Sequence, residues 1–170
     1  MRNIITIGLL MIMLFSPALA IGEGNVAHRI TYLIEGEAPL YSVKVNDVWD
    51  LTLNDGKITG VSEDGIVWFS TGYLDEVSNF TDALSFVKKK MSKKLENVNV
   101  TEETNIVVNG MEAVRLEGSA FEESKAVIFL VVVFQAQKGK FGAIAFVGDP
   151  LARDLHSATV SAMANSLLPA

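Results

Sequence analysis

The sequence predicts an α+β domain with a single central, largely antiparallel sheet flanked by helices. Short strand-like segments separated by turn residues occupy 28–71 and 98–147, a pattern typical of antiparallel sheets. Helical periodicity appears twice, at 80–95 and again from 149 onward. The segment 126–134 is almost wholly apolar, which predicts a central strand covered on both faces.

The first strands are expected at 28–34, 41–45 and 48–53, and 57–61 and 66–71 continue them. Tight turns are predicted between the last three segments, because the asparagine, aspartate and glycine found there tolerate the positive φ of hairpin turns. These segments are therefore expected to form an antiparallel meander.

The first helix is predicted by five apolar residues spaced four, three, four and four positions apart. They are Phe80, Leu84, Val87, Met91 and Leu95. This spacing places them on one helix face. Asn79 or Thr81 could cap the start, while Asp82 in the first turn and the lysines near the end suit the helix dipole.

Strands at 98–108 and 111–117 are joined by Asn109-Gly110, the strongest hairpin signal in the chain. A polar connection at 118–124 then leads to the apolar strand, and 141–147 forms the last strand. The final helix is expected to start at Asp149-Pro150, because a carboxylate caps well and proline suits the first helical position. Its predicted buried stripe contains Leu151, Leu155, Ala158, Ala162, Met163 and Leu167.

Residues 1–20 are predicted to be a secretory signal peptide. Arg2 precedes an apolar run at 4–15, and Ala18-Leu19-Ala20 supplies small residues at the cleavage position. Cleavage would leave 21–170, which is 170 − 20 = 150 residues and enough for one domain. We therefore expect a periplasmic or secreted protein that is soluble once the signal peptide is removed.

The composition excludes several classes of function. Asp and Glu outnumber Lys and Arg by 20 to 14, and loss of Arg2 gives 13 − 20 = −7, which disfavours nucleic-acid binding. The chain has no cysteine, so disulfides, thiolate metal sites, a cysteine nucleophile and lipid attachment to cysteine are excluded.

No arrangement of residues in the sequence predicts catalysis. Asp154, His156 and Ser157 supply the residue types of a triad, but at i, i+2 and i+3 of one helix they do not all face one another. The two histidines, His28 and His156, fall in different elements and form no metal-binding pair. We expect a protein that is not an enzyme and that uses no cofactor or metal.

A dense group of lysines marks the end of the first predicted helix. Lys89, Lys90, Lys93 and Lys94, together with Lys88, could contact an acidic partner or anionic lipid head groups. The alternative interpretation is a solvated helix face opposite the apolar stripe. The candidate partner-binding residues are Lys89, Lys90, Lys93 and Lys94.

Residues 107–118 read Val-Val-Asn-Gly-Met-Glu-Ala-Val-Arg-Leu-Glu-Gly, which contains the pattern V-N-G-x-x-A-x-R. Together with 140–146, Asp149-Pro150 and Trp49 after 41–45, this order resembles the PsbP-like group, although Asn46 stands where that group has proline. The group includes an extrinsic photosystem II subunit, a Ran-binding nuclear import factor and periplasmic DcrB-type proteins. The resemblance implies a sheet with helices on both sides and implies no reaction.

These observations favour an exported, non-catalytic binding or accessory protein that acts through a protein partner in the cell envelope. Weak contact with an anionic membrane surface through the lysines is a further expectation. The alternative is a small-ligand carrier or an envelope hydrolase with a pocket between sheet and helix. A stabilising ligand found by thermal shift would favour the carrier.

Overall fold

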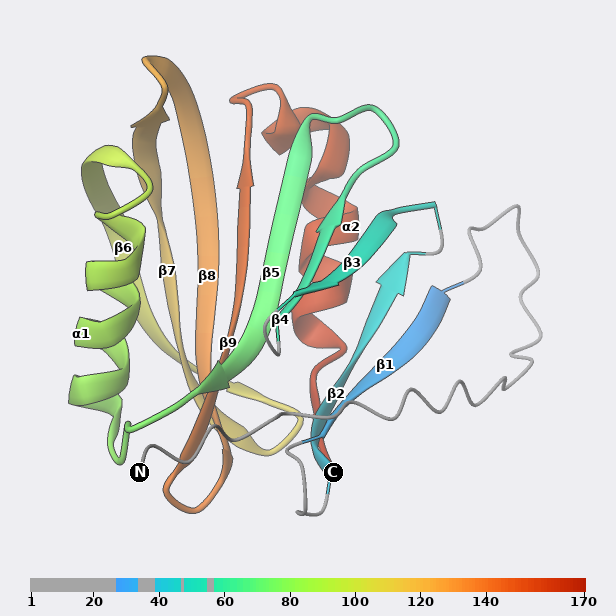
Figure 1. Cartoon of the computed structure of the whole chain (residues 1–170), viewed down its shortest axis with the longest axis vertical. Coiled ribbons are helices and arrows are strands. Elements are labelled where there is room, and N and C mark those ends of the chain that lie inside the picture. The colour runs from blue at the N-terminus through green and yellow to red at the C-terminus, as the bar shows by residue number, and fades with distance from the viewer. Residues whose placement is uncertain (1–26, 34–38, 47, 55–56) are drawn as a thin grey trace, which may run out of the picture.

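The computed structural model describes residues 27–33, 39–46, 48–54 and 57–170 (Figure 1). The predicted signal peptide, 1–20, lies outside the described residues, so its cleavage stays a prediction. Within the described part of the chain, no helix is both long and apolar enough to span a membrane.

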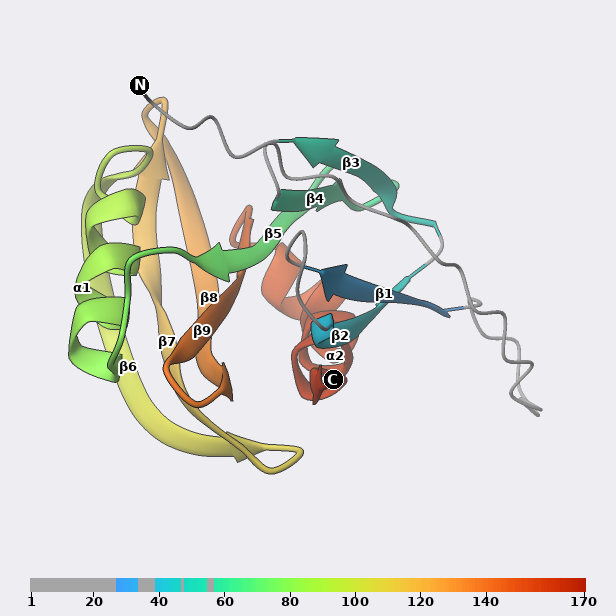
Figure 2. The same ribbon diagram turned by 60° about the horizontal axis from the view of Figure 1, so that its bottom comes forward.

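A seven-stranded antiparallel sheet forms the centre of the molecule (Figure 1). Its strands, in spatial order, are β3 (Asp50–Asn54), β4 (Lys57–Val61), β5 (Val67–Leu74), β9 (Lys140–Gly148), β8 (Lys125–Gln137), β7 (Met111–Glu122) and β6 (Glu96–Val108). Helix α1 (Phe80–Met91) lies on one face. Helix α2 (Ala152–Asn165) lies on the other (Figure 2). The predicted α+β class, with one large antiparallel sheet between helices, is confirmed.

The first two strands differ from the predicted meander. β1 (Ala27–Leu33) and β2 (Pro39–Asn46) pair in a small second sheet, together with β10 (Leu168–Pro169) at the end of the chain. Ser166 helps to hold β2 there, because its Oγ accepts a 2.8 Å hydrogen bond from the backbone N–H of Lys44. The sequence could not place β2 and β3 in different sheets, because the pairing of β2 depends on contacts with the distant end of the chain.

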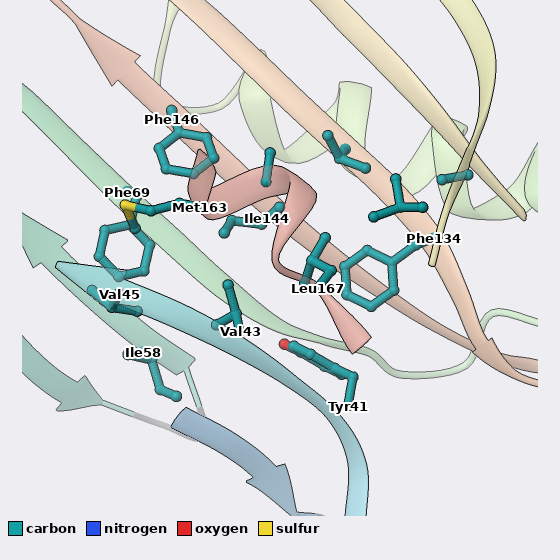
Figure 3. Close-up of a cluster of buried hydrophobic side chains, with 14 of the residues drawn as sticks. Tyr41, Val43, Val45, Ile58, Phe69, Phe134, Ile144, Phe146, Met163 and Leu167 are labelled. Atoms are coloured by element: carbon teal, nitrogen blue, oxygen red, sulfur yellow. The ribbon is translucent and has the colours of Figure 1, made fainter. Parts of the chain in front are cut away.

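β8 is central, as predicted, and each of its faces packs into a different hydrophobic cluster. Val131, which is 1% exposed, faces α1 together with Phe129 and Val133. Val132 and Phe134 belong to the cluster on the α2 side. Figure 3 shows Phe134 in this cluster. The alternation of side chains along a strand explains this division.

A buried tyrosine ties the small sheet to the large one. The ring of Tyr41 on β2 meets that of Phe134 edge-on, with the ring centroids 4.8 Å apart (Figure 3). The Tyr41 hydroxyl lies 2.8 Å from Thr71 Oγ1, which itself donates to the backbone carbonyl of Ala143. Thr71 Oγ1 therefore accepts from Tyr41, and the buried polar atoms of this contact are satisfied.

Helix α1 confirms the predicted apolar face and selects one of the two predicted caps. Asn79 is the N-cap, since its side-chain oxygen accepts from the backbone N–H of Asp82 at 3.0 Å. The helix ends at Met91, four residues before the predicted last apolar position. Leu95 is still buried, because a turn returns the chain to the same cluster.

The predicted buried stripe of α2 is wrong for four of its six residues. Leu151 and Leu155 are 62% and 63% exposed, and Ala158 and Ala162 are exposed as well. The buried residues of the helix are Ala152, Met163 and Ala164, and Leu167 is buried just after it. The sequence of α2 therefore contains two sets of residues with helical spacing, and tertiary packing determines which of them is buried.

The close approach of α2 to the sheet explains that choice. A Cβ built on Gly148 would lie 3.0 Å from the Cβ of Ala152, so only small side chains fit where the helix crosses β9. A leucine in place of Ala152 would push the helix off the sheet. The helix starts at Ala152, two residues later than predicted, while Asp149 Oδ1 accepts from the backbone N–H of Leu151 at 2.9 Å.

The polar connection predicted at 118–124 is mostly strand. β7 continues to Glu122, and only Glu123 and Ser124, with φ of 48° and 66°, form the turn into β8. Gly118 lies within the strand beside an irregular part of β6, where an added Cβ would come within 2.0 Å of the Asn99 carbonyl oxygen. A glycine and polar residues at this point mark a strand irregularity rather than a loop.

Candidate binding groove

A groove runs between helix α2 and the strands β6 to β9. It consists of two cavities of about 120 and 40 Å³, which share Arg115, Leu130 and Ser161 in their walls. We call it the α2 groove. The floor of the larger cavity is apolar and is formed by Ile128, Leu130 and Phe146 of the sheet, with Val160 on the helix side.

Strand alternation on β7 directs two charged residues into the α2 groove. Val114 and Leu116 face α1 and are buried there. Arg115 and Glu117 therefore face α2, where both line the larger cavity. An ion pair joins Arg115 Nη2 to the carboxylate of Glu117.

The guanidinium of Arg115 is only partly satisfied by this pair. Its Nε is buried and donates to no residue in the described part of the chain. The side chain as a whole is 41% exposed, so its outer nitrogens still reach the groove. A buried N–H without an acceptor costs free energy, so the pair with Glu117 leaves the guanidinium incompletely satisfied.

The helix wall of the groove is polar. Arg153, Ser157 and Ser161 recur every fourth residue of α2, which places them along one side of the helix, and all three line the larger cavity. Arg153 is exposed and forms no ion pair with the residues that the structure describes. Two arginines against one glutamate give the groove a local net charge of +1 in a chain of net charge −6.

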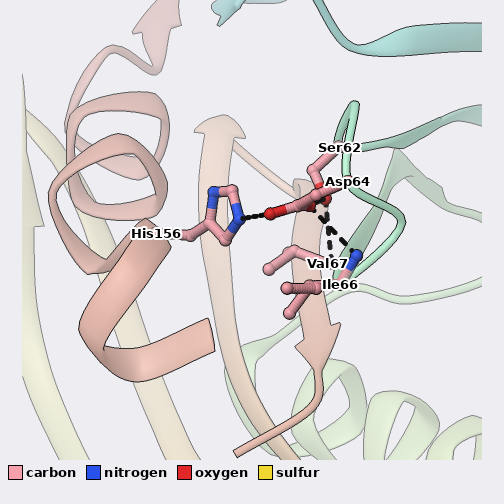
Figure 4. Close-up of polar contacts among 5 residues, drawn as sticks. All are labelled: Ser62, Asp64, Ile66, Val67 and His156. Atoms are coloured by element: carbon pink, nitrogen blue, oxygen red, sulfur yellow. Dashed lines mark hydrogen bonds and ion pairs between the residues drawn. The ribbon is translucent and has the colours of Figure 1, made fainter. Parts of the chain in front are cut away.

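A second polar cluster joins α2 to the turn between β4 and β5. His156 Nε2 lies 2.7 Å from Asp64 Oδ2 (Figure 4). Asp64 Oδ1 accepts from Ser62 Oγ at 2.6 Å and from the backbone N–H of Ile66 at 3.1 Å. These contacts lower the pKa of Asp64 to about 2. The hydrogen bond from Ser62 contributes most, and that from His156 contributes second most.

This second cluster has the wrong order for nucleophilic catalysis. The hydroxyl of Ser62 donates to the carboxylate, and the carboxylate lies between the serine and the imidazole of His156. A catalytic serine instead needs the imidazole next to it as a base. The cluster is therefore a tether between α2 and the β4–β5 turn.

The residues considered for a triad or a metal site are not brought together. His156 turns toward Asp64, Ser157 lines the α2 groove and Asp154 is exposed. His28 lies in β1, in the small sheet. Among the described residues, no group of three or more histidines, aspartates and glutamates could hold a metal ion.

The candidate lysines lie on the opposite face of the sheet from the α2 groove. Lys89, Lys90, Lys93 and Lys94 are all exposed, the last two in the turn after α1. Lys90 Nζ lies 5.2 Å from the centroid of the Phe86 ring. Lys88 Nζ forms a 2.7 Å ion pair with Glu103 of β6. The exposure suits both interpretations made from the sequence, so partner binding by these lysines stays a prediction.

Sequence reasoning missed Arg115 and Arg153. Arg115 carried a signal, because it is the arginine of the V-N-G-x-x-A-x-R pattern and lies on the same face of the strand as the apolar Met111 and Ala113. Arg153 carried none, since a charged residue early in a helix is ordinary surface. Their shared groove exists only once α2 lies on the sheet.

No known protein family matches the sequence, and no curated protein does. The three-dimensional arrangement defines a class of α+β proteins with an antiparallel sheet between two helices. Among solved structures, cyanobacterial PsbP from Synechocystis matches with a TM-score of 0.63 at 14% identity, over 91% of this chain and 100% of that one. The chain has the PsbP-like fold, which confirms the resemblance predicted from its sequence.

Two further structures support the fold. The Ran-binding protein Mog1p of Saccharomyces cerevisiae matches with a TM-score of 0.56 at 10% identity, over 86% of this chain and 96% of that one. PA94 of Pseudomonas aeruginosa, a protein of unknown function, matches with a TM-score of 0.55 at 15% identity, over 84% and 97%. Identities this low show the shared fold alone.

Proposed function

We propose that this chain is an exported, non-catalytic binding protein that acts through a protein partner in the cell envelope. The partner docks on the α2 groove. The observation that carries the proposal is the size of the groove together with its lining, an apolar floor beside two arginines.

The volume favours a protein partner over a small-molecule ligand. Sites that enclose small molecules usually measure ~300–1,000 Å³, whereas the larger cavity here measures about 120 Å³. A cavity of ~150 Å³ accommodates a group the size of benzene. The groove therefore suits one anchoring side chain of a larger partner, as the central pockets of protein interfaces do.

Two other lines of support are independent of the groove. The predicted signal peptide at 1–20 supports export, and thus an envelope partner. Mog1p, which shares the fold, is a Ran-binding protein, so this fold is compatible with binding through a protein partner. The exposed lysines in the last turn of α1 and just after it provide a second candidate surface for an acidic partner or for anionic lipid.

Site-specific photo-cross-linking in the native envelope tests the proposal. A photoreactive residue replaces Ser157 in the groove, Lys94 beside α1, or Lys138, an exposed control in the β8–β9 turn. We expect the Ser157 position to yield an adduct with one envelope protein and the Lys138 position to yield none. An adduct at Lys94 but not at Ser157 would move the binding surface to the lysines.

A thermal-shift assay tests the alternative that the protein is a small-ligand carrier. A panel of small metabolites in a thermal-shift assay should leave the melting temperature unchanged, because the groove encloses too little of such a molecule. A metabolite that raises the melting temperature in proportion to its concentration would favour the carrier instead.

A further inference from the structure

We propose that the α2 groove recognises an apolar side chain next to a carboxylate on the protein partner. The apolar side chain enters the larger cavity, and Arg115 and Arg153 bind the carboxylate. This inference rests on the proposed function and adds the chemistry of the segment that docks.

The apolar part of the ligand follows from the floor of the groove. Leu130 and Ile128 are only partly buried, whereas the next residues on the same face of β8, Val132 and Phe134, are buried. Phe146 and Val160 close the cavity beside them. A side chain of leucine size would cover these groups and displace water from them, which is the usual source of affinity at an interface pocket.

The carboxylate follows from the unfinished pairing of Arg115. Glu117 engages only Nη2, and neither Nε nor Nη1 has an acceptor among the described residues. A guanidinium binds a carboxylate best through two parallel N–H groups. A partner carboxylate that draws the guanidinium outward would accept from Nε–H and from the parallel N–H of Nη2, which gives the buried Nε an acceptor.

Arg153 strengthens the preference for an anion. It faces the same cavity from the opposite wall and has no ion-pair partner in the described part of the chain. The chain has a net charge of −6 and repels anions at long range, so an anionic segment needs local positive charge to bind, and the groove supplies a net charge of +1. The lysines at the end of α1 are also basic but line neither of the two cavities, whereas the groove places positive charge beside an apolar floor.

A membrane fits the groove less well than a protein segment does. Adsorption to anionic lipid uses several basic side chains spread over an exposed surface, each contributing modestly. Here two arginines line a recess between a helix and a sheet. A protruding chain end or loop reaches such a recess more readily than a flat bilayer does.

Nuclear magnetic resonance titration tests the chemistry with defined probes. The ¹⁵N-labelled protein, isolated after export, is titrated with N-acetylleucine, with N-acetylleucinamide, which lacks the carboxylate, and with N-acetylglycine, which lacks the side chain. We expect N-acetylleucine to shift the amides of Ser157 and Ser161 and the Nε–H of Arg115. The other two probes should bind at least about tenfold more weakly, the factor expected when a charge-assisted hydrogen bond or a buried side chain is lost.

Three variants assign the effect to the arginines. Arg115→Gln and Arg153→Gln should each reduce the preference for the acid over the amide, and Lys138→Gln, which also removes one positive charge, should leave it unchanged. Arg153 is exposed, so its variant tests the inference even if Arg115→Gln perturbs folding. Equal binding of the acid and the amide would overturn the inference. So would shifts outside the groove, or binding to phosphatidylglycerol vesicles that depends on the arginines without any response to N-acetylleucine.

The inference and the proposed function fail separately. If Ser157 still cross-links to an envelope protein but the probes show no preference for a carboxylate, the docking site stands and its proposed chemistry is wrong. If the probes bind as expected but no adduct forms at Ser157, the chemistry stands and the protein-partner function is wrong.

Discussion

The side chain of Asn109 joins the tip of the β6–β7 hairpin to the backbone that follows helix α2. Its Nδ2 donates to the carbonyl oxygen of Leu167 at 2.7 Å and to that of Asn165 at 2.8 Å. Asn109 also adopts the positive φ, 48°, that the hairpin turn requires. One residue therefore builds the turn and satisfies two carbonyls, that of the last residue of α2, which forms a wall of the groove, and that of Leu167 just beyond it.

The first prediction separates these two roles of Asn109. Asn109→Gly keeps the left-handed turn but loses both side-chain hydrogen bonds, so we expect a loss of about 1–3 kcal/mol in the free energy of unfolding. Asn109→Asp should cost more, because a carboxylate cannot donate and repels the helix carbonyls. Urea unfolding of the two variants measures both effects. A glycine variant as stable as the parent would mean that the two hydrogen bonds contribute nothing net.

The second prediction concerns the central strand. Val131→Asp buries an unpaired carboxylate at a position that is 1% exposed, so we expect it to remove a large part of the ~5–15 kcal/mol that stabilises a typical domain. Val107→Asp is the control, since Val107 is 71% exposed and opposes Glu112. The control should cost less than about 1 kcal/mol, mainly from repulsion by that glutamate. A cooperative melt of Val131→Asp near the parent temperature would contradict the packing of β8.

The third prediction concerns acid. The pKa of Asp64 falls from 3.8 to about 2 on folding, so its ionised form stabilises the native state. That contribution is fully present above pH 3.8 and is lost as the pH falls toward 2. Asp64→Asn should therefore be less stable than the parent at neutral pH, and the gap should narrow across this window. Thermal melts from pH 6 to about pH 2 measure it, with Glu63→Gln in the same turn as the control. A gap that does not change with pH would mean that ionised Asp64 is not stabilised by its neighbours.

The fourth prediction concerns the lysines. Replacing Lys89, Lys90, Lys93 and Lys94 with glutamine should leave the melting temperature nearly unchanged, because all four are exposed. If these residues bind an acidic partner or anionic vesicles, the variant should bind more weakly, and binding by the parent should weaken as salt is added. A variant with glutamine at Lys57, Lys125 and Lys138 controls for general charge. Unchanged binding by the quadruple variant would leave the lysines as a solvated face.

The fifth prediction concerns export. Signal peptidase should cleave after Ala20, because the preceding residues include small side chains at the positions that it recognises. Intact-mass measurement on the envelope fraction should show Ile21 as the amino terminus. Full-length protein in the cytoplasm would contradict both the cleavage and the envelope location.

Local sequence determined most of the secondary structure of this protein. Asn109-Gly110 is a turn because asparagine and glycine accept positive φ. The segment from Phe80 to Met91 is a helix whose apolar residues recur on one face. β8 is central because both of its faces are apolar. Each of these features depends on backbone conformation or burial within a few neighbouring residues.

Only the tertiary structure decided which surfaces meet. Both the face of α2 with Leu151 and Leu155 and the face with Ala152 and Met163 fit helical spacing. The close approach at Gly148 buries the face with Ala152. His156 contacts Asp64, which lies 92 residues earlier in the sequence. Arg115 and Arg153 line the same groove only because α2 crosses the sheet beside β7. A sequence pattern specifies a face, but the partner of that face depends on long-range packing, which local periodicity does not contain.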